Sequence, residues 1–418
     1  MKVMKSRLVM LTLVSAFSLQ PSALLYAQGS LTPPGAPAAT MKTLAQIEPR
    51  TPINTLSGDG QDIYVISQPG SYYLTTNITA TGSLNAISIN TNGVSLDLDG
   101  FTIASTGANG TAILLAGNQV TGIGNADITI SNGHIRGSVT NNAGTYGGPG
   151  FYNGISYNNA GGTPYNVRVS GITVSGCQNF GIFLGTDGSS VVESCTVSTV
   201  GGYGIQASGV SHSTAVQCGA TSISADTASD CYASTTGGGY GLVASYSADN
   251  CYANSQGGSG LLASTAHNCI SLGSGSGDGL DVEIASDCYG YSSGSGEGLH
   301  ADTVANNCYG YSGGSGFGLF ASLANDCYGD SVSGTGLYVG TANNCNGHCV
   351  GTGIGLSADS ANNCIGGTGG GGTGLNVTGT AIGCYCFSSS GVAISAHIAN
   401  SCMVAGGTTN ITYKYNMP

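Results

Sequence analysis

An apolar residue returns at steps of 18 to 20 residues along the C-terminal half of the chain. The positions are Leu242, Leu261, Leu280, Leu299, Leu319, Leu337, Leu356, Leu375 and Ile394. Cysteines run in phase with them, at Cys231, Cys251, Cys269, Cys288, Cys308, Cys327, Cys345, Cys364, Cys384 and Cys402. A repeat of roughly twenty residues is typical of a solenoid, in which each coil buries its apolar side only against its neighbours.

A single repeat shows how the coil is built. In Gly298-Leu299-His300-Ala301-Asp302, Leu299 and Ala301 are two residues apart and point inward on a strand, whereas His300 and Asp302 point outward. Asn and Asp are frequent just before the cysteines, and both tolerate the left-handed backbone of a sharp corner. Stacked helices are excluded by 72 glycines and few Lys or Glu. The sequence therefore predicts an all-β coil with three short strands.

The N-terminus has the pattern of an export signal, predicted to span residues 1–27. Lys2, Lys5 and Arg7 precede a mostly apolar run, and Ala27 is the expected cleavage residue. An uncleaved anchor helix is the alternative, although the apolar run is short for a membrane span. No later stretch has the length and hydropathy of a span. The mature protein is therefore predicted to be secreted, periplasmic or attached to the cell surface.

The rest of the chain divides into four predicted segments. They are a proline-rich linker (28–50), irregular coils with a cap and an inserted loop (51–176), regular coils (177–407), and a C-terminal cap or tail (408–418). Caps are expected because the two ends of a solenoid expose unpaired strand edges.

The charge is strongly acidic. The chain carries 8 Lys and Arg against 20 Asp and Glu, and three of the basic residues lie in the predicted signal. Such a surface repels nucleic acid, which is bound by clustered basic residues, so no nucleic-acid partner is expected. It also disfavours polyanionic sugars unless a cation bridges the two.

The segment from Thr51 to Ile103 resembles a known group of proteins. Its tract Val94-Ser95-Leu96-Asp97-Leu98-Asp99-Gly100-Phe101-Thr102-Ile103, together with the Asn/Asp corners, is similar to secreted right-handed parallel β-helix proteins of the pectate-lyase-like superfamily. The resemblance implies a single-stranded, right-handed parallel β-helix (β-solenoid) over most of the chain beyond residue 50. This superfamily includes polysaccharide lyases, hydrolases, epimerases, phage tailspikes and adhesins, so the fold does not select an activity.

The catalytic motifs of that superfamily are weakly matched. A lyase would be expected to use Ca²⁺ held by acidic residues and an Arg or Lys base, but only Arg136 and Arg168 lie in the coil body. The hydrolase pattern is matched only at Gly133-His134, and the next residue is Ile135 rather than glycine. Neither enzymatic branch is indicated by its motif.

Acidic residues and one histidine recur at the same positions of two adjacent coils. They are Asp278, Asp281 and Glu283 in one coil and Glu297, His300 and Asp302 in the next. At a coil spacing of about 4.8 Å, stacking is predicted for Asp278 on Glu297, Asp281 on His300, and Glu283 on Asp302. Three functions are open for this acidic patch: glycoside cleavage by Glu283, Asp302 and His300, binding of Ca²⁺, or a solvated strip that keeps the coil soluble.

All fifteen cysteines lie from Cys177 onward. Neighbouring coils place equivalent Cα atoms within disulfide range, so bridges between coils are one alternative. A column of free, buried thiols that pack like small apolar side chains is the other. The ladder has no Cys-x-x-Cys pairs, so no zinc or other structural metal site is predicted.

Tyrosines form two outward-facing columns. Tyr289, Tyr309 and Tyr328 follow ladder cysteines, and Tyr291 and Tyr311 lie two residues further on. These rings are predicted either to bind sugar rings or a partner surface, or to stack on one another and stiffen the solenoid.

The sequence thus predicts an extracellular β-helix of structural type, or one that binds a carbohydrate or a surface. A polysaccharide or cell-surface glycan is the expected partner, and no cofactor is expected unless Ca²⁺ binds. The alternative is a polysaccharide-active enzyme, either a glycoside hydrolase or a lyase, centred on the acidic patch.

Overall fold

The structure is a computed structural model that describes residues 49–107, 109–118 and 120–417. The chain divides into two units, Met1–Pro49 and Arg50–Pro418, and the second contains the fold. The predicted signal (1–27) and nearly all of the predicted linker (28–50) lie outside the described residues. No helix in the described part of the chain has the length and hydropathy to cross a membrane.

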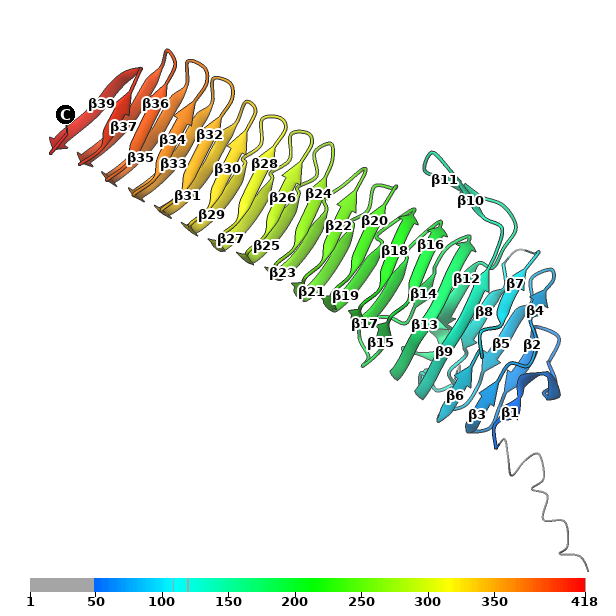
Figure 1. Cartoon of the computed structure of the whole chain (residues 1–418). Coiled ribbons are helices and arrows are strands. Elements are labelled where there is room, and N and C mark those ends of the chain that lie inside the picture. The colour runs from blue at the N-terminus through cyan, green and yellow to red at the C-terminus, as the bar shows by residue number, and fades with distance from the viewer. Residues whose placement is uncertain (1–48, 108, 119, 418) are drawn as a thin grey trace, which may run out of the picture. The chain divides into compact units, whose positions relative to one another are not determined.

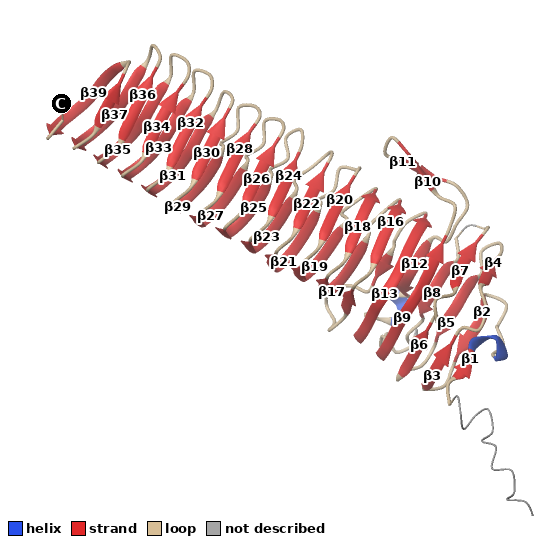
Figure 2. Cartoon of the chain, in the orientation of Figure 1, coloured by secondary structure: helices blue, strands red, loops and turns tan. Residues whose placement is uncertain are grey.

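The second unit is a parallel β-solenoid, and Figures 1 and 2 show its strands stacked coil upon coil with almost no helix. The first coils contain β1 (Thr51–Pro52), η1 (Ile53–Thr55), β2 (Asp62–Ile66), β3 (Gly70–Tyr73), β4 (Ile78–Ala80), β5 (Asn85–Ile89), β6 (Val94–Asp97), β7 (Thr102–Ser105), β8 (Thr111–Leu115), β9 (Ala126–Arg136), β12 (Asn153–Tyr157), η2 (Asn159–Gly161), β13 (Tyr165–Cys177), β14 (Ile182–Phe183), β15 (Val191–Glu193) and β16 (Thr196–Val200).

In the later coils a long and a short strand alternate. The long strands are β17 (Ile205–Ser211), β19 (Ile223–Ser229), β21 (Leu242–Asp249), β23 (Leu261–His267), β25 (Leu280–Ser286), β27 (Leu299–Asn306), β29 (Leu319–Asn325), β31 (Thr335–Asn343), β33 (Ile354–Asn362), β35 (Thr373–Ile382), β37 (Val392–Asn400) and β39 (Thr408–Tyr415). The short strands are β18 (Thr214–Cys218), β20 (Tyr232–Thr235), β22 (Tyr252–Ser255), β24 (Ile270–Gly273), β26 (Tyr289–Ser292), β28 (Tyr309–Ser312), β30 (Tyr328–Ser331), β32 (Asn346–Cys349), β34 (Ile365–Thr368), β36 (Tyr385–Ser388) and β38 (Met403–Ala405).

The predicted leucine ladder is confirmed. Leu280 pairs with Leu299 and Leu299 with Leu319 in parallel register, and all three side chains are fully buried. Each ladder leucine begins or lies near the start of a long strand, and each ladder cysteine lies just before a short strand. Identical side chains therefore lie above one another from coil to coil, as the repeat requires.

The predicted corners are also confirmed. The residue before each ladder cysteine has a φ of +50° to +63°, the left-handed conformation that Asn, Asp and Gly adopt most readily. These residues are Asp230, Asn250, Asn268, Asp287, Asn307, Asp326, Asn344, Asn363, Gly383 and Ser401. Their side chains form a hydrogen-bonded ladder in places, since Asn268 donates to Asn250 at 2.7 Å and Asn307 donates to Asp287 at 2.6 Å.

The inserted loop expected within residues 51–176 corresponds to a short hairpin in the structure. Only β10 (Thr140–Asn142) and β11 (Thr145–Gly147) form an antiparallel hairpin, which projects from the stack in Figure 1. β12 is an ordinary part of the coil, because it pairs in parallel with β8 and β14. At the other end, β39 continues the stack by pairing with β37, and most of its side chains are exposed.

Candidate functional site

The acidic patch is organised around the imidazole of His300. Its Nδ1 lies 2.8 Å from Oε2 of Glu297 and its Nε2 lies 3.1 Å from Oδ1 of Asp302. Asp281 pairs with His300 across β25 and β27, as predicted. The backbone N–H of Glu297 donates to Oδ1 of Asp278 at 2.7 Å, so these two positions also lie together.

The third predicted pair is not in register. The ladder between β25 and β27 shifts after Val282, and the next paired residues are Ile284 and Val304. Thr303 donates to the backbone carbonyl of Glu283 at 2.7 Å, while the Asp302 carboxylate bonds His300. The Asp302 carboxylate therefore belongs to the group of side chains around His300. Glu283 is exposed and is not one of the paired residues of β25 and β27.

Electrostatics in the patch favour a charged histidine. The hydrogen bond that His300 donates to the Glu297 carboxylate is the main cause that raises the pKa of His300 to about 9, although partial burial opposes the shift. Burial raises the pKa of the Asp278 carboxyl, and it also raises the pKa of Asp281 against the lowering effect of His300. At neutral pH the imidazolium is thus an internal cation for Glu297 and Asp302. Among the described residues, no group of three or more His, Cys, Asp or Glu is arranged to hold a metal ion.

An aromatic cluster continues the row of His300 toward the C-terminus. The rows pair His300 with Phe320 and Phe320 with Tyr338. The His300 and Phe320 ring centroids are 4.6 Å apart, and those of Phe320 and Tyr338 are 5.7 Å apart with nearly parallel planes. Sequence reasoning missed this cluster, although a large aromatic residue at an outward position of the repeat was the available signal.

These aromatic rings line a groove of about 210 Å³, here called the Tyr338 groove. Its polar lining comes from hydroxyl groups of Ser322, Ser357 and Thr378 and from the carboxylate of Asp359, which accepts a hydrogen bond from Thr378 at 2.8 Å. Tyr338 is 44 % exposed, although Phe317 stacks on its ring with centroids 4.9 Å apart. The groove thus combines an apolar wall with several hydrogen-bonding groups.

The tyrosine columns are packed against themselves. The ring of Tyr309 lies between Tyr289 and Tyr328, with centroids 5.1 and 5.0 Å apart and planes within 4° of parallel. Tyr291 and Tyr311 stack in the same way at 5.1 Å. A neighbouring ring therefore faces each side of the Tyr309 ring, and its edge and hydroxyl group point outward. This geometry corresponds to the predicted stiffening role, while sugar binding by the columns stays a prediction.

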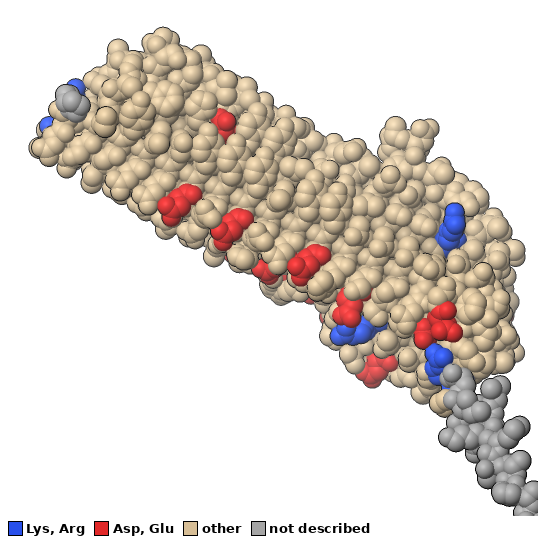
Figure 3. Space-filling view, viewed as in Figure 1, with Lys and Arg blue, Asp and Glu red and all other residues tan. Residues whose placement is uncertain are grey.

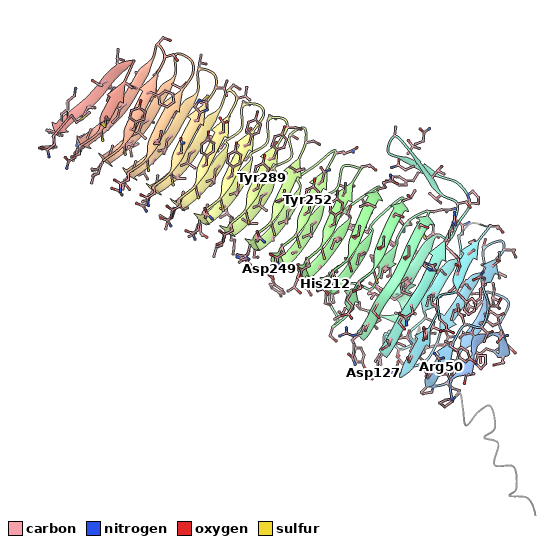
Figure 4. The ribbon with its side chains drawn as sticks, viewed as in Figure 1. Arg50, Asp127, His212, Asp249, Tyr252 and Tyr289 are labelled. Carbon is pink, nitrogen blue, oxygen red and sulfur yellow. The ribbon has the colours of Figure 1, made fainter. Side chains whose placement is uncertain are left out.

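Charge is distributed unevenly over the solenoid. In Figure 3 the Asp and Glu side chains gather along one edge, and the broad face toward the viewer carries few charges. Figure 4 places Asp249 and His212 at that edge and Tyr252 and Tyr289 on the broad face. This edge contains the corner ladder, by which we mean the left-handed residues before the cysteines and the side chains beside them. There His267 lies 3.8 Å from Asp249 and 3.6 Å from Asp287. The two labelled tyrosines thus lie away from the acidic edge.

The fifteen cysteines are all free and buried. Several thiols donate to backbone carbonyls, as Cys327 does to Ala305 and Asn325. Burial raises the pKa of Cys177 and of Cys218 to about 12, so these thiols stay protonated and weakly nucleophilic. Of the two alternatives, the structure has the column of free thiols, and the cysteines act in packing.

Comparison with known proteins assigns no family. No protein-family model matches the chain, and no curated protein matches it. Among solved structures, the chain is similar to ORF18 of Geobacillus virus E2 (12 % identity over 84 % of this chain, TM-score 0.21), and it spans 53 % of that protein. It is also similar to PfbA, a surface adhesin of Streptococcus pneumoniae (10 % identity over 88 % of this chain and 93 % of PfbA, TM-score 0.23). Similarity at this level does not bear on what the chain binds.

Proposed function

We propose that this protein is an extracellular β-solenoid that binds a surface polysaccharide through the Tyr338 groove. The observation that carries the proposal is the groove itself, in which Phe320 and the exposed Tyr338 face hydroxyl groups and one carboxylate. Sugar rings have apolar C–H faces and polar edges, so they match an aromatic wall with a hydrogen-bonding rim.

The charges near the groove narrow the ligand class. Asp359 lines the groove, and the carboxylates around His300 lie further along the same row of the solenoid. Polyanionic chains are repelled by this surface, whereas neutral chains and chains with amino sugars are accommodated. The ligand is therefore a neutral or amino-sugar polysaccharide.

A glycan array with the purified mature protein tests this function. Tyr338→Ala is expected to weaken binding about tenfold, because truncation of a central aromatic residue commonly costs about 1.4 kcal/mol or more. Tyr246→Ala is the matched control, since Tyr246 is 67 % exposed and does not line the groove. Loss of binding in Tyr309→Ala but not in Tyr338→Ala would move the site to the tyrosine columns and refute the groove.

A polysaccharide-active enzyme is the second candidate, favoured by the raised pKa of the Asp281 carboxyl beside His300. Burial raises the pKa of this carboxyl group, and a carboxyl group with a raised pKa near other carboxylates is the arrangement that supplies an acid in glycoside cleavage. The array polysaccharides should then yield new reducing ends, and Asp281→Asn and Asp302→Ala should abolish them. Running the assay with and without Ca²⁺ separates the hydrolase from the lyase alternative. An absence of product from every polysaccharide would reject the enzyme.

A further inference from the structure

A second groove lies in the N-terminal coils, in a region where the sequence offered no candidate site. It has a volume of about 390 Å³, and β12, β14 and the segments beside them form its walls. Three aromatic rings line it in a row, because Tyr157 stacks on Phe183 at 5.4 Å and Phe183 stacks on Phe180 at 4.2 Å. We call it the Tyr152 groove after the most exposed of its aromatic residues.

Tyr152 differs from the other rings in this groove. It is 45 % exposed, and no ring pair involves it among the described residues. Tyr157, Phe180 and Phe183 are half-buried and hold one another in place. The groove therefore has a wall of three packed rings and a fourth, more exposed ring beside it.

Four asparagines supply the polar lining. Asn153 is fixed by the coil, since its Oδ1 accepts from the backbone N–H of Phe180 at 3.2 Å and its Nδ2 donates to Ser156 at 3.2 Å. Asn158 accepts from the N–H of Ala160 at 3.0 Å through its Oδ1, which leaves its Nδ2 without a hydrogen bond among the described residues. Asn159 is exposed, and its side chain likewise makes no hydrogen bond within the described ranges. Free donors and acceptors thus border the aromatic wall.

From this chemistry we infer that the Tyr152 groove is a binding site for a neutral glycan. A carboxamide offers both donors and acceptors, as a sugar hydroxyl does, and an aromatic ring packs against the C–H face of a pyranose. No charged residue lines the groove, so it offers no ion-pair partner to a charged ligand. A proline-rich peptide also binds aromatic grooves, but it has few donors to satisfy several carboxamides.

The two grooves lie on the same row of the solenoid. Phe183 and Phe320 occupy equivalent positions seven coils apart in an unbroken series of parallel pairings. Coils about 4.8 Å apart put the grooves about 34 Å from each other along the stack. One long chain can engage both grooves, and binding of its second segment then becomes intramolecular. The N-terminal site itself does not depend on the function proposed for the Tyr338 groove.

Titration of the full mature chain with neutral glycans tests this site. The probes are short oligomers and long polymers of glucan, mannan, galactan and xylan, together with a polyproline peptide. Tyr152→Ala and Asn159→Ala are expected to weaken binding of the preferred oligomer about tenfold and severalfold respectively. Tyr165→Ala is the control, because Tyr165 is 49 % exposed and lies outside the groove. Unchanged circular dichroism and melting temperature establish that each variant folds.

Each outcome decides the inference separately from the proposed function. Weakening by Tyr152→Ala in a protein that already carries Tyr338→Ala supports an independent N-terminal site, and a larger loss for the polymer than for the oligomer supports joint engagement. The inference is wrong if Tyr152→Ala binds every glycan as tightly as the control, even where Tyr338→Ala has lost binding. It is also wrong if only the polyproline peptide binds at Tyr152, or if no neutral glycan binds at all.

Discussion

The N-terminal and C-terminal coils fill their interiors in different ways. The coils before residue 152 each bury several large side chains, and Phe151, Ile87 and Ile130 are examples. The C-terminal coils bury leucine, alanine, cysteine and serine instead. In the most regular coils the two walls touch, because a Cβ added to Gly310 would lie 2.1 Å from the carbonyl oxygen of Gly318. The same close approach recurs at Gly290, Gly329 and Gly347.

This difference explains why one part of the chain repeats and the other does not. A wide interior can be filled by many combinations of large side chains, so coil length and loop insertions vary. A narrow interior with backbone against backbone leaves no such freedom, and small residues must return at fixed positions. The N-terminal coils can therefore accommodate the hairpin of β10 and β11 and the Tyr152 groove, whose volume is larger than that of the Tyr338 groove.

The strongest way to break this arrangement is to force the walls of a narrow coil apart. Gly310→Val is expected to destabilise the protein by more than about 4 kcal/mol, because the new side chain meets backbone that cannot move aside. Urea denaturation measures the loss, and hydrogen–deuterium exchange should locate it in β26 to β30. Gly238→Val, where an added Cβ meets nothing within 4 Å, should change stability by less than about 0.5 kcal/mol. Equal effects of the two variants would mean that the walls are not in contact.

Truncation of buried side chains tests the other half of the comparison. Ile130→Ala is expected to cost about 3 kcal/mol in the wide coils, where it leaves a cavity. Cys308→Ala should cost about 1 kcal/mol, because only one sulfur atom is removed from a narrow interior. The free energy of unfolding from urea titrations measures both. A cost for Cys308→Ala as large as that for Ile130→Ala would indicate that the thiol ladder does more than pack.

The same contrast governs what the sequence could predict. Leu280, Leu299 and the residues before the cysteines were placed correctly because every narrow coil repeats the same constraints. Glu283 and Asp302 are not a paired position of the ladder, because β27 has one more residue than β25 between the neighbouring pairs Val282–Ala301 and Ile284–Val304. At such a bulge, equal spacing along the chain does not place two residues in register. The Tyr152 groove could not be predicted from the sequence for a related reason. The N-terminal coils lack a regular repeat, so the spacing of the aromatic residues does not indicate which of them lie next to one another.

The left-handed corner residues test whether the backbone of the narrow C-terminal coils is rigid. Asn307 has a φ of +50°, so Asn307→Ala is expected to cost about 1 kcal/mol, whereas Asn307→Gly should be nearly neutral. Gly383 already occupies the equivalent corner with a φ of +63°. Melting temperatures of the two variants provide the measurement. A stable alanine variant would show that the corner can relax, contrary to a rigid narrow coil.

The last prediction concerns the pH dependence of stability, because the N-terminal and C-terminal coils pair their carboxylates with different cations. Arg50 bonds Asp97 at 3.0 Å in the N-terminal coils, and a guanidinium keeps its charge through neutral and mildly alkaline pH. In the C-terminal coils the corresponding cation is His300, whose pKa is raised to about 9 from its ordinary value of 6.5. Stabilisation by a raised pKa is complete below pH 6.5 and is lost as the pH rises through 9. The loss should be of the order of 1 kcal/mol once solvent screening is allowed for.

Comparison of the wild type with His300→Gln isolates this contribution, because glutamine keeps a hydrogen-bonding group but does not titrate. The stability difference between the two proteins should shrink between pH 6.5 and 9, while Arg50→Gln should differ from the wild type by a constant amount over the same range. A difference that stays constant for His300→Gln would mean that the imidazole is neutral in the folded state. The acidic patch would then lack its internal cation, and binding of Ca²⁺ by Glu297 and Asp302 would become the better explanation of the cluster.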